Sequence, residues 1–202
     1  RVAPDHDMAA FYHAVAVEMS GADADALFAV LNQENPTMAA WLDSWTYIKS
    51  HSTLASEIIH DPFRLLHHAF DAAPKEGLVL EFGVRHGMSL RHIAGLTSAR
   101  VHGFDSFQGL PTAWGDEPEG VYSTGGVLPE VPGNVTLHPG LFEDTLADFL
   151  AAHPGDIRFC NIDCDIYAST VTVLDALAPR LQPGSVLVFD EYLVNPTWRE
   201  DE

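Results

Sequence analysis

The sequence has little positive charge and lacks a long apolar run. Ten Lys and Arg residues stand against 29 Asp and Glu residues, which gives a formal net charge of −19. Because this charge would repel a phosphate backbone, we expect no nucleic-acid partner and no anionic membrane partner. No uninterrupted apolar stretch reaches the roughly 18 residues that a membrane helix needs, so no membrane span is predicted.

Cysteine is also scarce. Cys160 and Cys164 lie four residues apart in a stretch that we interpret as one strand. At about 3.3 Å per residue they would be about 13 Å apart, which is too far for a disulfide bond. The scarcity of cysteine fits a reducing cytoplasm, and the chain shows no basic-then-apolar leader. We therefore expect a cytoplasmic protein.

The chain changes character near residue 76. Before it, apolar residues recur at helical spacing, Thr37 is a candidate helix cap, and Asp61-Pro62 predicts another helix start. We expect an N-terminal helical cap region, 1–75, followed by a Rossmann-like domain, 76–202. The alanine-rich first helix suits a homo-oligomer interface as well as a core, so both interpretations stay open.

Five apolar stretches after this point predict the strands of a parallel sheet. They are 78–84, 101–106, 134–138, 157–163 and 185–190, with helices at 88–98, 142–153 and 168–178. Short crossovers make such strands parallel. The fold class is therefore α/β, a doubly wound parallel sheet. Because such sheets usually extend further, we expect the C-terminal strands to be missing.

Residues 107–133, here called the long segment, are rich in Gly, Pro and acids, and a loop of this length is usually functional. The turn before it, Gly83 to Gly87, follows a buried strand and opens a helix. Gly83 would let the backbone approach a ligand, and Gly87 would let the helix pack closely on the strand. Arg85 stands where a dinucleotide-binding turn has its second glycine, which disfavours a nicotinamide-dependent oxidoreductase. A nucleoside with its own positive charge fits better, and S-adenosylmethionine meets that description.

Acidic residues lie at the carboxyl ends of four of the predicted strands, at the edge where an open parallel sheet binds its ligands. They are Glu81, Asp105, Asp163, Asp165, Asp190 and Glu191. Six converging carboxylates would repel one another without a cation. This suggests a positively charged cofactor near Glu81 and Asp105 and a metal ion near the last two strands. Asp105 is placed to accept hydrogen bonds from ribose hydroxyls, and a structural turn aspartate is the alternative.

Five motifs occur in an order that a known family shows. They are EFGVRHG (81–87), GFDSFQGLP (103–111), GLFEDTL (140–146), DCDIYAST (163–170) and DEY (190–192). Over about residues 76–194, they resemble the class I S-adenosylmethionine-dependent methyltransferases, in particular the macrocin O-methyltransferase-like family. The resemblance implies methyl transfer from S-adenosylmethionine, assisted by Mg²⁺, to a hydroxyl of a small molecule such as a sugar or another secondary metabolite.

The resemblance also implies which residues bind. The cofactor would contact residues of the first turn and of the strand ends, namely Glu81, Gly83, Val84, Arg85, Gly87, Ser89, Asp105, Ser106, Phe107, Leu141, Phe142 and Asp163. The divalent-metal acids of the family fall on Asp163, Asp190 and Glu191. The family often has two aspartates where this chain has Asp190-Glu191, so the sequence departs from the pattern there.

Asp163 and Asp165 are the candidate catalytic residues. Mg²⁺ held by carboxylates can coordinate an alcohol oxygen and lower its pKa, and Asp165 is the candidate general base. The alternative for Asp165 is a cap on the helix that begins near Ala168. Two other functions stay open: a metal-independent methyltransferase in which the acids order loops, and a non-catalytic relative that binds the cofactor.

Overall fold

The structure is a computed structural model that describes residues 4–52, 59, 61–115 and 117–190. The chain divides into two compact units, one within residues 1–57 and the other within residues 58–190. Each is a separate body with its own core. Among the described residues, none of the helices has both the length and the apolarity that crossing a membrane requires.

The first unit contains three helices, α1 (Pro4–Met19), α2 (Asp25–Ala29) and α3 (Pro36–His51). Its core contains Phe11, Val15, Leu31, Met38 and Trp45.

The start of α3 differs from the expectation. The cap is Asn35 rather than Thr37, because the Asn35 side chain accepts a hydrogen bond from the Thr37 backbone N–H at 3.0 Å. Pro36 then takes the first helical position, where its missing N–H costs nothing. The prediction of Thr37 as the cap is therefore wrong by two residues, although the predicted helix is present.

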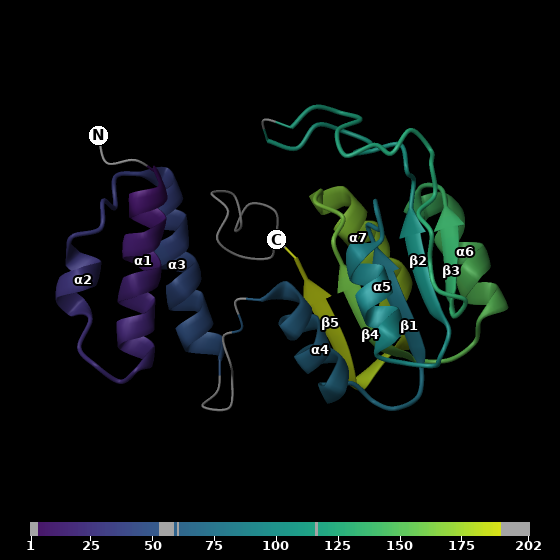
Figure 1. Ribbon diagram of the computed structural model, residues 1–202, viewed down its shortest axis with the longest axis horizontal. Helices are drawn as coiled ribbons and strands as arrows, with labels where there is room; N and C mark the ends of the chain where they lie inside the picture. The colour runs from purple at the N-terminus through teal and green to yellow at the C-terminus, as the bar shows by residue number, and fades with distance from the viewer. Residues whose placement is uncertain (1–3, 53–58, 60, 116, 191–202) are drawn as a thin grey trace. The chain divides into compact units, whose positions relative to one another are not determined.

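The second unit is built on a five-stranded parallel sheet with strand order β3-β2-β1-β4-β5. The strands are β1 (Leu78–Phe82), β2 (Val101–Asp105), β3 (Val135–Pro139), β4 (Ile157–Ile162) and β5 (Leu181–Phe189). Figure 1 shows the long segment leaving the carboxyl end of β2 and passing over that edge of the sheet. All five predicted strands are present, and the predicted parallel arrangement is confirmed.

Helices cover both faces of this sheet (Figure 1). They are α4 (Pro62–Ala72), α5 (Met88–Gly95), α6 (Phe142–Ala152) and α7 (Tyr167–Leu177), with a short 3-10 turn, η1 (Ala178–Arg180), after α7. Residues of α4 and α5 pack with Val79 and Phe159 on one face. Residues of α6 and α7 pack with Leu80, Phe82 and Cys160 on the other. Because successive side chains of each buried strand point to opposite faces of the sheet, they contribute to two apolar layers.

Helix α4 contributes Leu66 and Phe70 to the core of the sheet. The predicted boundary at residue 76 leaves this helix with the N-terminal helices, whereas its apolar face packs in the second unit. Its predicted start is confirmed, since Asp61 Oδ1 accepts hydrogen bonds from the N–H groups of Phe63 and Arg64 at 2.9 and 3.0 Å. Cys160 and Cys164 are both free and buried.

Candidate active site

Glu81 is a fully buried carboxyl group near the end of β1. Its side chain is 0% exposed and lies in register with Asn161 of β4. Oε1 accepts hydrogen bonds from the Ser89 hydroxyl and from the Asn161 amide, the latter at 3.2 Å. Oε2 has no hydrogen-bond partner among the described residues. Burial raises the pKa of Glu81 to about 8. A buried polar atom without a partner is rare, and a bound ligand group is one arrangement that would satisfy it.

Asp105 joins the turn after β1 to the start of the long segment. Its Oδ2 accepts hydrogen bonds from the N–H groups of Val84 and Arg85 at 2.8 and 2.7 Å, and its Oδ1 accepts one from Phe107 at 2.6 Å. Asp105 is thus a structural turn residue, the alternative left open by the sequence. A carboxylate has about four acceptor positions. One position on Oδ1 therefore remains for a hydroxyl donor.

The two glycines of the first turn serve contacts within the protein. Gly83 has φ +89°, and a Cβ there would overlap the backbone carbonyl of Asp163. Gly87 has φ +70° at the start of α5, and a Cβ there would lie 3.3 Å from Pro129. The close approach that Gly83 permits is therefore between the loops after β1 and β4, and Gly87 is required by its left-handed backbone.

The residues predicted to border the adenine offer different surfaces. Phe107 is 2% exposed and belongs to the core on the α5 side, and the Phe142 ring packs edge-on against Phe82 with centroids 5.3 Å apart. Leu141, the residue before α6, is 36% exposed. The Ser106 hydroxyl makes hydrogen bonds within its own turn. Leu141 therefore offers an accessible apolar side chain, whereas the two phenylalanine rings are core.

The structure brings the predicted acids of four strands to one edge of the sheet. Asp163 and Asp190 directly follow the neighbouring strands β4 and β5. The charges of Asp163 and Asp105 act on Glu81 and oppose its ionisation. Since electrostatic effects of this kind fall off with distance, the carboxylates lie near one another.

The predicted metal site is only partly within the described residues. Asp163 and Asp190 are described, whereas Glu191 lies outside the described residues. Among the residues that the structure describes, no group of three or more His, Cys, Asp and Glu side chains is arranged to hold a metal ion. Two carboxylates at adjacent strand ends are donors that suit Mg²⁺, and they would be part of a ligand set for such an ion.

Asp165 lies in the loop between β4 and α7 with an unusual backbone. Its φ is +60°, and its side chain is partly buried. Burial raises the pKa of Asp165, and the charge of Asp190 adds to this, whereas the charge of Arg85 opposes it. The residue before α7 is Ile166, and among the described residues no side chain caps that helix. The alternative interpretation of Asp165 as a helix cap is therefore wrong.

Two residues that the sequence did not single out belong to this edge. Asn161 is 4% exposed and donates to Glu81. Its signal was available, because it is a polar residue in a buried strand. Tyr122 of the long segment lies under the Arg85 guanidinium, whose Cζ is 4.8 Å from the ring centre. Nothing in the sequence indicates this contact, because Arg85 and Tyr122 lie far apart along the chain. Ser89, predicted to contact the cofactor, donates its hydroxyl to Glu81.

The strand order and the polar groups at the carboxyl ends define a Rossmann-like domain with a ligand-binding edge. The sheet has the arrangement of the class I methyltransferase fold. The family described as "Methyltransferase domain" matches residues 80–192. This chain belongs to that family.

Similar proteins include a curated relative and solved structures. The 8-demethyl-8-(2,3-dimethoxy-alpha-L-rhamnosyl)-tetracenomycin-C 4'-O-methyltransferase of Streptomyces olivaceus is 32% identical over 122 residues, with 50% of this chain and 45% of that protein covered. The match thus spans less than half of the relative. A crystal structure of CalS11, a calicheamicin methyltransferase, has a TM-score of 0.56 at 22% identity, covering 100% of this chain and 83% of that one. An apo structure of CalS11 has a TM-score of 0.51 at 24% identity, covering 84% and 82%. These structural likenesses show the fold.

Proposed function

We propose that this chain is an S-adenosylmethionine-dependent O-methyltransferase, assisted by Mg²⁺, that acts on a hydroxyl of a small molecule. The observation that carries the proposal is the Glu81 carboxyl, fully buried beside the first turn with one oxygen lacking a partner among the described residues. A buried carboxyl of this kind suits a cationic ligand group, which would favour its ionised form. Membership of the Methyltransferase domain family supports the same activity.

The residues that would hold the cofactor lie at the ends of β1, β2 and β3. Glu81 would bind the amino group of the methionine part, and Asp105 Oδ1 would accept a hydrogen bond from a ribose hydroxyl. Leu141 would cover one side of the adenine. When bound, S-adenosylmethionine supplies a methyl group on a positively charged sulfur, ready for displacement by an oxygen nucleophile.

The acceptor would be activated at the ends of β4 and β5. Asp165 would take the proton from the acceptor hydroxyl as its oxygen bonds to the methyl carbon, and the raised pKa of its carboxyl makes it a stronger base. Asp163 and Asp190, with Glu191, would hold Mg²⁺, which would supply a Lewis acid that lowers the pKa of the hydroxyl.

The acceptor that we propose is a sugar hydroxyl of a secondary metabolite. The Streptomyces olivaceus relative is named for 4'-O-methylation of a rhamnosylated tetracenomycin C, and its match supports this class of acceptor. The long segment beside the first turn would form part of the acceptor pocket, since loops at this edge usually set specificity.

A methyl-transfer assay tests the proposal. The full chain is incubated with methyl-labelled S-adenosylmethionine, Mg²⁺ and a panel of rhamnosides, and products are identified by mass spectrometry. We expect a monomethylated product, and we expect Asp165→Asn to lower turnover by about 10²-fold or more. Asp148→Asn, on the exposed side of α6, makes the same charge change and should keep turnover. Equal turnover by the two variants would remove Asp165 from the mechanism.

A metal-independent methyltransferase is the second candidate. In that reaction Asp163 and Asp190, which directly follow β4 and β5, would order the loops instead of holding an ion. Full activity of Asp163→Ala in a chelating buffer would establish it in place of the Mg²⁺-assisted reaction. Cofactor binding without transfer to any member of the panel would instead indicate the non-catalytic relative.

A further inference from the structure

The long segment is closed on itself by hydrogen bonds near its start. The backbone carbonyl of Phe107 accepts hydrogen bonds from the N–H groups of Gly126 and Thr124, at 2.9 and 3.3 Å. Leu110 and Val121 are joined by a backbone hydrogen bond at 3.0 Å. The chain therefore leaves β2, extends outward and returns to its own base, which gives this part of the segment a defined conformation.

Arg85 and Tyr122 connect the returning part of the segment to the turn after β1. The Arg85 guanidinium lies over the Tyr122 ring with its Cζ 4.8 Å from the centroid. Both residues have positive φ, +48° for Arg85 and +66° for Tyr122. Residues other than glycine rarely adopt a positive φ, and they keep it only where surrounding contacts enforce it. The stack therefore joins two strained positions that lie on different loops.

The backbone supports the same junction. Asp105 accepts a hydrogen bond from the Arg85 N–H through Oδ2 and one from the Phe107 N–H through Oδ1. One carboxylate thus fixes the base of the long segment and the residue whose side chain holds its returning part. The Asp105 hydrogen bonds and the Arg85–Tyr122 stack therefore both connect the turn after β1 to the long segment, and together they position one relative to the other.

We propose that Arg85 and Tyr122 are positioning residues that clasp the long segment onto the first turn. The clasp holds the segment above the carboxyl ends of the strands, where Figure 1 shows it passing. In this position it forms the acceptor side of the pocket, a role that rests on the proposed function. Loss of the Tyr122 ring should leave cofactor affinity unchanged, because the Asp105 hydrogen bonds to the backbone of Arg85 and Phe107 do not depend on that ring.

Limited proteolysis measures the clasp directly. The long segment contains no Lys or Arg, so a glutamate-specific protease is used, and Glu119 is an exposed site close to Tyr122. Cleavage inside a folded segment requires local opening. An Arg–aromatic contact contributes enough that its loss should raise the open population by roughly threefold to thirtyfold. We expect Tyr122→Leu to be cut faster by that factor and Tyr122→Phe, which keeps the ring, to be cut more slowly than Tyr122→Leu.

A double variant tests whether the two residues act together. Arg85→Met should speed cleavage as Tyr122→Leu does, and the double variant should be cut no faster than either single variant. The midpoint of thermal unfolding should be the same for wild type and Tyr122→Leu, which separates opening of the segment from a global loss of stability. Wild-type and Tyr122→Leu chains that are cut at equal rates would overturn the clasp. Equal acceleration by Tyr122→Phe and Tyr122→Leu would also overturn it, because the hydroxyl would then be the holding group.

Titration with S-adenosylhomocysteine separates this inference from the proposed function. Affinity in Tyr122→Leu within twofold of wild type supports a clasp that positions the segment alone, and a larger loss contradicts it. If wild type binds no S-adenosylhomocysteine, the proposed function fails, while the proteolysis of the unliganded chain still decides whether the clasp exists.

Discussion

Two buried polar groups on neighbouring strands, Glu81 of β1 and His102 of β2, are treated differently by the fold. Glu81 is hydrogen-bonded through one oxygen to Ser89 and Asn161, and its other oxygen has no partner among the described residues. His102 is 3% exposed, and its Nδ1 lies 3.0 Å from Nε2 of His138, within hydrogen-bond distance. The histidine pair is satisfied within the protein, whereas Glu81 keeps an oxygen available. Under the proposed function, this difference separates a structural polar pair from a group that binds the cofactor.

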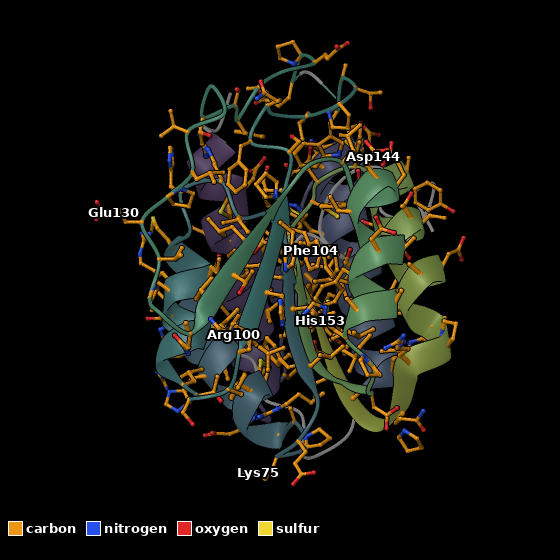
Figure 2. The ribbon with its side chains drawn as sticks, turned by 90° about the vertical axis from the view of Figure 1, so that its right-hand side faces the viewer. Lys75, Arg100, Phe104, Glu130, Asp144 and His153 are labelled. Carbon is orange, nitrogen blue, oxygen red and sulfur yellow. The ribbon has the colours of Figure 1, made fainter. Side chains whose placement is uncertain are left out.

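The surroundings of His102 reinforce its structural role. Its ring lies 4.7 Å from the Phe149 ring and 4.8 Å from the His153 ring, between centroids, on the face of the sheet covered by α6. Figure 2 labels His153 and Phe104 on this side of the sheet. Burial, with the charges of His138, His153 and Arg100, lowers the pKa of His102 to about 4. Burial thus favours the neutral forms of both Glu81 and His102, through pKa shifts of opposite sign.

The largest effect should follow from Glu81→Gln, which keeps the shape and removes the ionisable oxygen. A buried ammonium that loses its carboxylate costs about 3 to 5 kcal/mol. We therefore expect affinity for S-adenosylmethionine to fall at least a hundredfold in isothermal titration calorimetry. Glu76→Gln, at an exposed position two residues before β1, makes the same charge change and should bind as wild type. Similar affinity in the two variants would make Glu81 a structural residue like His102.

The same Glu81→Gln variant should become more stable relative to wild type as the pH rises. An acid with a raised pKa in the folded state keeps its proton while the unfolded chain loses it, so folding becomes less favourable between the two pKa values. For Glu81 this interval runs from 4.5 to about 8, and the slope is about 1.4 kcal/mol per pH unit. Denaturant unfolding should therefore show a growing advantage of the variant from pH 5 to pH 8. An advantage that does not change with pH would contradict the raised pKa.

Asp105→Asn should produce a smaller loss in both properties. The amide oxygen can still accept hydrogen bonds, but its NH₂ group faces a backbone donor. We expect a loss of about 1 to 3 kcal/mol in the free energy of unfolding and roughly tenfold weaker cofactor binding, measured by chemical denaturation and calorimetry. Asp148→Asn is again the matched control. A stability loss without any change in affinity would leave Asp105 as a structural residue only.

His102→Phe tests the smallest expected effect, the pH-dependent contribution of the His102 imidazole, which should appear only at low pH. A base whose pKa is lowered by folding stabilises the protein fully above its unfolded pKa, near 6.5, and loses that stabilisation as the pH falls toward 4. Wild type should therefore lose about 1 to 2 kcal/mol between pH 7 and pH 5 through this group. In the variant this loss should be reduced, whereas His68→Asn, an exposed site, should leave it unchanged. Equal losses in all three chains would show that His102 does not titrate as described.

The order of the elements was predictable because it depends on local pattern. The apolar stretches after residue 76 gave all five strands, and Asp61-Pro62 gave the start of α4. Boundaries were less accurate where turn residues lie within an element. Strand β5 begins at Leu181 rather than at residue 185, because the chain pairs with β4 across the register shift between Ile157 and Phe159. Pattern alone does not reveal a register shift.

The site was predictable where a residue carries its own chemistry at a strand end. Glu81 and Asp105 are polar residues at the ends of apolar strands, and the structure places both at one edge. The contacts of the site were not predictable. Asn161 stands out as a polar residue in a buried strand, but its contact with Glu81 depends on strand pairing, and the contact between Tyr122 and Arg85 depends on the return of a long loop. Both contacts depend on tertiary structure that a single sequence does not specify locally.

The central claim is that S-adenosylmethionine binds at the carboxyl ends of β1 and β2 with Glu81 as its carboxylate partner. Because the pKa of Glu81 is about 8, this group is mostly protonated at pH 7 and must ionise when it pairs with an ammonium group. Calorimetric titration of the full chain at pH 7, in two buffers of different ionisation enthalpy, measures the number of protons released when the cofactor binds. We predict one cofactor bound per chain with net release of protons, and no such release from Glu81→Gln. Binding without proton release, or no binding by the wild-type chain, would contradict the account.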